Sequence, residues 1–342
     1  MASATTAPAH PLYSPSVGAR RKNVTLPTLP ASAFTSPPGT GTNEQFPIPP
    51  SPSTVRPAAL VDAGVVSSLE QWKAQIGDEL VAKSRGVVLV LDSVDDAAIK
   101  AAEQDSAVLA VSVPFDLAAG VPDESSLPAY IAAPPPNLAI ALRTSFTDFT
   151  PQHADGVHWA VSRGHAVDIH VLADLNTEGG WESLSELITS ALSSERGPSS
   201  SGKTGTIVLS NVLPAPVDMS ITIVKLLTHP VYTNFQAYIS TVSLFSNVYL
   251  KYSPPTWGSA VPKIGTEAGR DWKRRIKMYL GQGVEAFGDR RILFASGPSV
   301  GPDVIDSGDW YALARESLAE LGLDQEAVDA IFAANAQTVY SV

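Results

Sequence analysis

The stretch Arg290–Val300, which reads Arg-Arg-Ile-Leu-Phe-Ala-Ser-Gly-Pro-Ser-Val, is the clearest indication of how this chain folds. Its apolar run Ile292–Ala295 is typical of a short, fully buried strand, and the Ser-Gly-Pro that follows predicts a turn. In chains that alternate strands with helices, chemistry usually lies where such a strand ends. Here that place falls to Gly297, which carries no functional group.

Seven more apolar runs lie between Ala58 and this strand, and each is followed by a segment with a helical pattern. This alternation predicts a parallel sheet with crossover helices. Eight such units in about 280 residues match a single (β/α)8 TIM barrel. A doubly wound open sheet is the alternative, but the first turn, Val65–Ser68, lacks a glycine-rich phosphate fingerprint. The seven runs are Leu60–Val66, Gly86–Leu91, Ala107–Val113, Leu138–Leu142, Ala166–Leu172, Thr206–Ser210 and Asn247–Lys251.

The expected helices lie between and after these strands, and the last of them follows the capping residue Asp324. They are Ser68–Ser84, Asp96–Gln104, Ser125–Ile131, Pro151–Arg163, Trp181–Ser194, Val217–Leu227, Gly269–Gly281, Trp310–Leu321 and Gln325–Asn335.

Residues 1–57 differ in composition from the rest, because they are rich in Pro, Ser, Thr and Ala. Such a segment buries too little apolar surface to fold as a domain of its own. We therefore divide the chain into an N-terminal arm, 1–57, and a barrel domain, 58–342. The arm is expected to be either disordered or extended over the barrel or a neighbouring subunit. An arm extended over a neighbouring subunit would form a homodimer.

Composition excludes several classes of protein. The net charge of −11 argues against nucleic acid or an anionic membrane as a partner, since both need a positive surface. The chain has no cysteine, which excludes disulfides and thiolate metal sites. No apolar run approaches the roughly 18 residues that span a bilayer. We expect an acidic, soluble protein of the cytoplasm. A mitochondrial location is the alternative, because no acidic residue precedes Glu44.

The segment Gly197–Thr204 fits the letter pattern of a phosphate-binding P-loop. That mechanism needs a strand before the loop and a helix after it, whereas here the expected order is reversed. The segment therefore indicates an exposed loop and no nucleotide cofactor.

Polar residues stand at the ends of most predicted strands, where a barrel would bring them to one rim. Alternation places Asp168 and His170 on the same face of their strand. The cations Arg143 and Lys251 favour a small anionic ligand, although a buried lysine could also act as a base or Schiff-base former, and either cation could form a structural ion pair instead. The candidate catalytic residues are His170, Asp168 and Lys251, and the candidate ligand-binding residues are Asp92, Arg143, Asn211 and Ser296.

Several strands together resemble those of the amidohydrolase-related family, metal-dependent TIM-barrel hydrolases, lactonases and decarboxylases. The resemblance covers roughly Val61 to Val342. It rests on Val61-Asp62-Ala63, on Ala-Val-Asp-Ile-His-Val at 166–171, on Thr-Ile-Val-Leu-Ser-Asn at 206–211, on Asn-Val-Tyr-Leu-Lys-Tyr-Ser at 247–253, on Arg-Ile-Leu-Phe-Ala-Ser-Gly-Pro at 291–298, and on the closing segment Gly322–Tyr340. It implies a barrel whose metal is held at the ends of strands one, five, six and eight.

The departures from that pattern are informative. The histidines of strand one correspond to Gly64 and Val66, the histidine of strand six to Asn211, and the aspartate of strand eight to Gly297. Only His170 keeps the family's residue type. A zinc or manganese site needs about three converging protein ligands, so we expect no metal and no other cofactor.

Two functions follow as hypotheses. The first is a pseudoenzyme that binds a small molecule or a protein. The second is a metal-independent hydrolase, lactonase or decarboxylase for a small anionic substrate, with His170 as base, Asp168 or Asp92 orienting it, and Arg143 and Lys251 binding the anion.

Overall fold

The computed structural model describes residues 54–66, 68–193, 204–257, 261–262, 265–297 and 305–341. All but the last four residues of the predicted arm, the homodimer expected through it and most of the Gly197–Thr204 loop fall outside these ranges.

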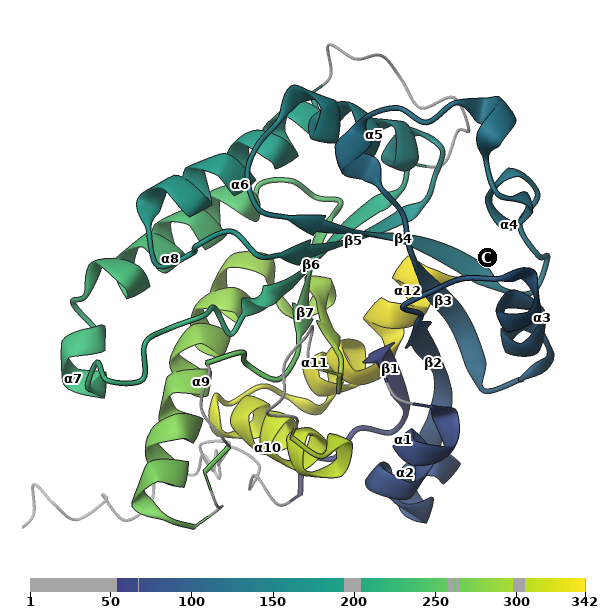
Figure 1. Ribbon diagram of the computed structural model, residues 1–342. Coiled ribbons are helices and arrows are strands. Elements are labelled where there is room, and N and C mark those ends of the chain that lie inside the picture. The colour runs from purple at the N-terminus through teal and green to yellow at the C-terminus, as the bar shows by residue number, and fades with distance from the viewer. Residues whose placement is uncertain are drawn as a thin grey trace, which may run out of the picture. The chain divides into compact units, whose positions relative to one another are not determined.

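Eight parallel strands pair in sequence order, each with the next along the chain, and the predicted TIM barrel is confirmed (Figure 1). Two hydrogen bonds bring the last strand to the first. The Gly297 amide donates to the Gly64 carbonyl at 2.8 Å, and the Ser296 amide donates to the Asp62 carboxylate at 2.9 Å. The strands are β1 Leu60–Val65, β2 Ser84–Val90, β3 Val108–Pro114, β4 Ala139–Phe146, β5 Ala166–Val171, β6 Thr206–Leu213, β7 Val248–Tyr252 and β8 Ile292–Phe294.

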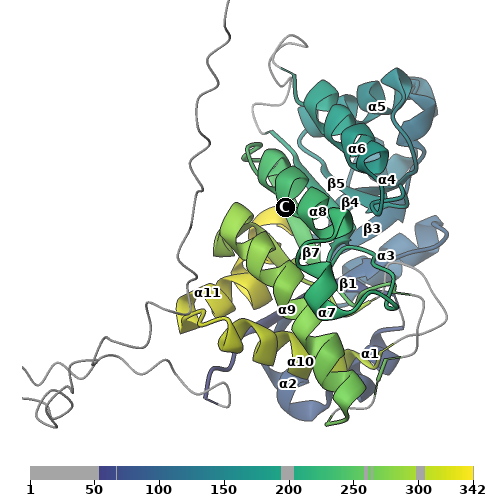
Figure 2. The same cartoon turned by 90° about the vertical axis from the view of Figure 1, so that its left-hand side faces the viewer.

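Helices cover the outside of the barrel, and α5, α6, α8, α9, α10 and α1 contact one another in that order (Figures 1 and 2). The helices are α1 Leu69–Ile76, α2 Asp78–Lys83, α3 Asp96–Gln104, α4 Ala129–Ala132, α5 Pro151–Ser162, α6 Glu178–Ala191, α7 Ile223–Leu226, α8 Pro230–Val242, α9 Glu267–Phe287, α10 Ser307–Glu320, α11 Gln325–Asp329 and α12 Asn335–Tyr340, with a π-helical turn η6 at Ala330–Ala334 and short 3-10 turns η2 Leu117–Ala119, η3 Glu124–Ser126 and η5 Asp289–Arg291. No helix within the described ranges combines the length and apolarity needed to cross a bilayer.

Three of the expected helices are divided or shortened in the structure, and the expected helix Gly269–Gly281 is longer, since α9 ends at Phe287. The expected helix Ser68–Ser84 is two helices, because Gly77 adopts a positive φ of 77° between them. Pro128 similarly divides Ser125–Ile131 into η3 and α4, since the residue before a proline avoids helical geometry. Of Val217–Leu227, only the four residues of α7 are helical.

Sequence analysis also missed α8. His229 caps this helix through its ring, and Pro230 occupies its first position. Apolar residues at Val231, Phe235 and Ile239 then bury one face. A proline at the start of a helix followed by this spacing was a readable signal.

The last expected helix, Gln325–Asn335, extends further, through η6 into α12. Its continuation depends on tertiary contacts of Asn335, whose side-chain amide donates to the carbonyls of Asp289 at 2.7 Å and Ile292 at 2.8 Å. These bonds attach α12 to the beginning of β8. Figure 1 shows α12, in yellow, beside β1 and β3.

The barrel interior is lined by unusually small side chains. Buried TIM-barrel interiors are dominated by Val, Ile and Leu, whereas here alanines occupy many inward positions. The helix α12 supplies the missing bulk from the amino-terminal end of the strands, where Val339 and Tyr340 border the first residues of β4, β5 and β6. The interior cluster comprises Val61, Ala63, Val88, Ala110, Ala141, Ala166, Val208, Leu293, Ala295, Ala333, Ala336, Val339 and Tyr340.

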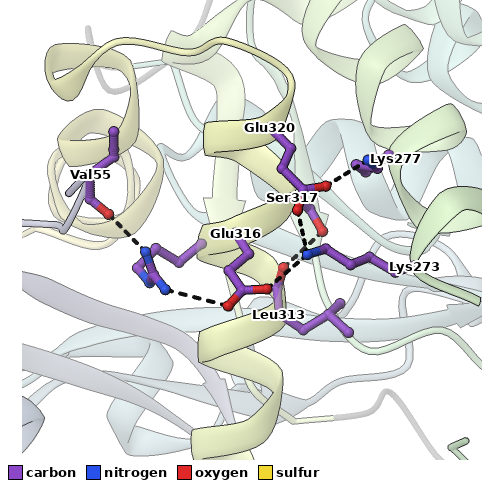
Figure 3. A network of polar contacts seen from close by, with 8 residues as sticks. Val55, Lys273, Lys277, Leu313, Glu316, Ser317 and Glu320 are labelled. Atoms are coloured by element: carbon purple, nitrogen blue, oxygen red, sulfur yellow. Dashed lines mark hydrogen bonds and ion pairs between the residues drawn. The ribbon is translucent and has the colours of Figure 1, made fainter. Parts of the chain in front are cut away.

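Ion pairs join α9 to α10, and a hydrogen bond attaches the segment before β1 to α10 (Figure 3). Lys273 bonds Glu316 at 2.7 Å and Glu320 at 2.6 Å, and Lys277 bonds Glu320 at 2.6 Å. On the same helix, Arg315 donates to the carbonyl of the buried residue Val55 at 3.0 Å. Such half-exposed pairs contribute little singly, but together they align two helices that follow the strands of the site.

Candidate functional site

A small pocket of about 40 Å³ lies at the carboxyl ends of the strands. Its two halves differ in chemistry. Strands β4 to β7 contribute polar side chains, namely Arg143, Asp168, His170, Ser210, Lys251 and the following Ser253. The other half, from β8, β1 and β2, contributes glycines and apolar residues, namely Gly297, Ala295, Gly64, Val66 and Val90.

Asp168 is the most heavily bonded residue of the polar half. One carboxylate oxygen accepts from the Ser112 hydroxyl at 2.6 Å and from the Lys251 ammonium at 2.8 Å. The other accepts from the Tyr340 hydroxyl at 2.6 Å. All four side chains are buried, so the charge of the carboxylate is shared among donors from β3, β7 and α12. A buried ion pair of this kind needs such extra hydrogen bonds to offset its desolvation.

His170 lines the pocket two residues further along β5, and its Nδ1 lies 3.4 Å from the Ser210 hydroxyl. Burial, together with the nearby cations Arg143 and Lys251, lowers the pKa of His170 from 6.5 to about 4. The ring is therefore neutral at neutral pH. No hydrogen bond joins His170 to Asp168 or Asp92 within the described ranges, so the predicted orienting role of those carboxylates is not seen.

Arg143 enters the pocket from within β4, three residues before this strand ends. Its Nη2 donates to the Leu91 carbonyl at 2.5 Å and lies 3.5 Å from the exposed carboxylate of Asp92. Its Nε is buried and donates to no acceptor among the described residues. A buried donor without a partner costs free energy, and other atoms of the Arg143 side chain line the pocket.

The glycine half of the pocket is closed by backbone contact between β8 and β1. A Cβ atom at Gly297 would lie 2.3 Å from the Gly64 carbonyl oxygen and 2.5 Å from a Val66 methyl group. A Cβ at Gly64 would lie 3.1 Å from that of Ala295. Residue 297 therefore has room for hydrogen alone while the two strands keep this spacing.

Three predicted ligand-binding residues lie outside the pocket. Asn211, at a positive φ of 63°, donates to the Val171 carbonyl at 2.7 Å and accepts from Thr256 at 2.6 Å. It thereby ties β5 to the segment after β7, and its neighbour Ser210 faces the pocket instead. Ser296 points to Asp62, as expected from the alternation that turns Ala295 and Gly297 inward. Asp92 is exposed and reaches the site only through Arg143.

Four polar residues of the site were missed from the sequence. Alternation could have found Ser210, which lies two residues after the inward-facing Val208, and in the same way Ser112 and Ser253. Nothing in the local pattern around Tyr340 indicated that it would reach Asp168, because the two lie 172 residues apart.

The residues present do not fit the divalent metal that the family resemblance implies. Gly64, Val66 and Gly297 offer no side-chain ligand, and the acceptor capacity of Asp168 is already engaged by three donors. Two cations, Arg143 and Lys251, face the same space. Among the described residues there is no group of three or more His, Cys, Asp or Glu side chains that could hold a metal ion.

Comparison with solved structures supports the fold. An amidohydrolase from Burkholderia multivorans with bound HEPES aligns with a TM-score of 0.57 and 16% identity, over 83% of this chain and 99% of that one. Another crystal form of an amidohydrolase from that organism, with bound zinc, gives a TM-score of 0.54 and 15% identity over the same shares. A putative 2-pyrone-4,6-dicarboxylic acid hydrolase from Pseudomonas putida gives 0.54 and 14%, over 83% and 97%.

These neighbours are amidohydrolase-family TIM barrels, and at such low identity they establish the fold of this chain and not its activity. No protein-family model and no curated protein matches the sequence.

Proposed function

We propose that this barrel is a non-catalytic, metal-independent binding module for a small carboxylate. The observation that carries the proposal is that two cationic side chains, Arg143 and Lys251, line the same small pocket. A carboxylate bound there would accept from these two cations, and charge-assisted hydrogen bonds of this type are strong.

The charges around the pocket favour a single negative charge on the ligand. Lys251 is balanced by Asp168, but that carboxylate is shared with two hydroxyl donors. Among the described residues Arg143 pairs with Asp92 alone, whose side chain is 87% exposed and therefore screened by water. A neutral His170 adds a polar group without adding a competing charge.

The size of the pocket favours a small ligand. A volume of about 40 Å³ exceeds the roughly 10–15 Å³ that one water needs by this measure. It admits a carboxylate head group, and any larger part of the ligand would extend out of the mouth.

A metal-independent hydrolase or decarboxylase is the second candidate. It is favoured by the neutral His170 ring close to the Ser210 hydroxyl. It is disfavoured because a base with a pKa of about 4 takes up a proton poorly at neutral pH, and because Asp168 bonds Lys251 rather than His170. Binding without turnover therefore has the better support.

The proposal is tested by calorimetric titration of the full chain with acetate, and separately with phosphate and sulfate, at low ionic strength and neutral pH. Acetate should bind with a Kd on the order of 1 mM, as expected for a ligand of so few atoms. Arg143→Gln should weaken binding at least about tenfold, while the matched control Arg85→Gln, an exposed arginine on β2, should not change it. Tighter binding of phosphate than of acetate, or equal binding by Arg143→Gln, would overturn the carboxylate assignment.

Two further measurements separate the candidates. Elemental analysis of the purified protein should find zinc and manganese well below one atom per chain. A stoichiometric metal that His170→Gln removes would overturn the proposal that the pocket works without a metal. Assays with simple esters, lactones and aromatic carboxylic acids should show no turnover above that of His170→Gln. Turnover that requires His170 would establish the enzyme instead.

A further inference from the structure

The tyrosine at the end of α12 reaches the charged pair of the pocket from the opposite end of the barrel. Tyr340 is almost completely buried among the interior alanines. Its hydroxyl donates to Asp168 at 2.6 Å, and the Lys251 ammonium lies 5.6 Å from the centre of its ring. One side chain therefore contacts both members of the ion pair.

The hydroxyl of Tyr340 stays protonated and therefore always donates its hydrogen to Asp168. Burial and the neighbouring Asp168 carboxylate raise the pKa of Tyr340 well above 10. The Asp168 oxygen that it bonds is the one that Lys251 does not use. The tyrosine thus keeps that oxygen occupied and prevents the carboxylate from turning both oxygens toward the ammonium.

The place of Tyr340 is set by the start of β8. One hydrogen bond from Asn335 holds α12 against the first residue of this strand, and a second reaches the preceding turn η5. Ala336 and Val339 pack on the interior alanines of the same face. The ring is therefore anchored independently of the pocket and can hold the carboxylate without being moved by a ligand.

We propose that Tyr340 is a positioning residue of the anion pocket, which acts through Asp168 to leave the Lys251 ammonium available to a carboxylate ligand. This inference rests on the proposed function. Lys251 carries three donor hydrogens, of which one is given to Asp168. Holding the carboxylate by Tyr340 on one oxygen and by Ser112 on the other limits how much of the positive charge it neutralises.

The test is Tyr340→Phe, which retains the ring over Lys251 and the packing but removes the hydroxyl. Acetate should bind about five- to tenfold more weakly than to the wild type. The matched control is Tyr279→Phe, since the hydroxyl of Tyr279 is equally buried but has no partner among the described residues. This control should leave acetate affinity unchanged.

A double-mutant cycle separates positioning from a general structural effect. In an Asp168→Asn background, Tyr340→Phe should change acetate affinity less than about twofold, because the group through which it acts has been altered. Equal effects of Tyr340→Phe in both backgrounds would overturn the inference.

A spectroscopic measurement on the wild type does not depend on how well the variants fold. Tyrosine labelled with ¹³C at Cζ gives one resonance per tyrosine, and the resonance absent from Tyr340→Phe is assigned to Tyr340. It should shift on addition of acetate, whereas that of Tyr279 should not; no shift at saturation would overturn the inference. Absence of acetate binding to the wild type would instead defeat the proposed function, so the two failures are distinguishable.

Discussion

The two halves of the barrel mouth are built in opposite ways. On the side of β4 to β7, side chains from distant elements meet in a charged network centred on Asp168. On the side of β8 and β1, the backbones of Gly297 and Gly64 touch, and no side chain fits at Gly297. The polar half therefore offers charged and hydrogen-bonding groups to the pocket, whereas Gly64 and Gly297 offer no side chain. This difference is the basis of our proposal that the pocket binds an anion without a metal.

The largest effect, a loss of stability, is expected when Lys251→Met removes the buried cation of the polar half. This change leaves the buried Asp168 without a cation, and loss of one partner of a buried pair costs about 3–5 kcal/mol. Urea denaturation monitored by circular dichroism measures the change in the free energy of unfolding. Lys83→Met, which removes a more exposed lysine paired with Glu79, should cost less than about 1 kcal/mol. A similar, small loss of unfolding free energy in both variants would contradict a large contribution of the Lys251–Asp168 pair to stability.

The glycine half is tested by Gly297→Asp, which introduces the carboxylate that the family resemblance implies at this position. Because the new Cβ would meet a backbone carbonyl oxygen, unfolding should require about 3 kcal/mol less than in the wild type, and zinc should not be recovered with the protein. The control is Gly179→Asp in the first turn of α6, where a Cβ meets nothing within 4 Å and an acidic residue is favourable. A stable Gly297→Asp protein with bound zinc would show that the two halves can be made alike.

The titration of His170 sharpens the comparison, since only the polar half contains a titrating group that faces the pocket. Between pH 6.5 and about 4, the unfolded chain binds a proton at this residue that the folded chain does not. Its contribution to stability is therefore lost as the pH falls through this window, by at most about 3 kcal/mol, and levels off below it. His170→Gln should accordingly show a shallower fall in the free energy of unfolding between pH 7.5 and 4. Parallel curves for the two proteins would contradict the lowered pKa.

The smallest effect is expected at the edge of the polar half, from Asp92→Asn. This exposed carboxylate competes weakly with a ligand for Arg143, so the variant should bind acetate about twofold more tightly and change stability by less than about 0.5 kcal/mol. Calorimetric titration beside the wild type measures the affinity. Weaker binding would mean that Asp92 positions Arg143 rather than competing for it.

Local patterns in the sequence carried most of the fold. Short apolar runs separated by helical segments predicted all eight strands, because a parallel strand buried on both faces is recognisable from its own residues. The helix α8 was missed although its proline and apolar spacing were readable. The extension of the last helix through α12 was not readable, since it depends on hydrogen bonds between Asn335 and β8.

The candidate site divides in the same way. The sequence by itself determined that His170 and Lys251 stand near strand ends and that Gly64, Val66 and Gly297 cannot serve as metal ligands through their side chains. Arg143 was expected at a strand end, but β4 continues for three residues beyond it. Only the tertiary structure showed that Asp168 accepts a hydrogen bond from Lys251 and not from His170, and that its other oxygen accepts one from Tyr340. The physical reason is distance along the chain: the partners of Asp168 lie 56, 83 and 172 residues away. Strand periodicity tells which way a side chain points, but not which donor from another element will reach it.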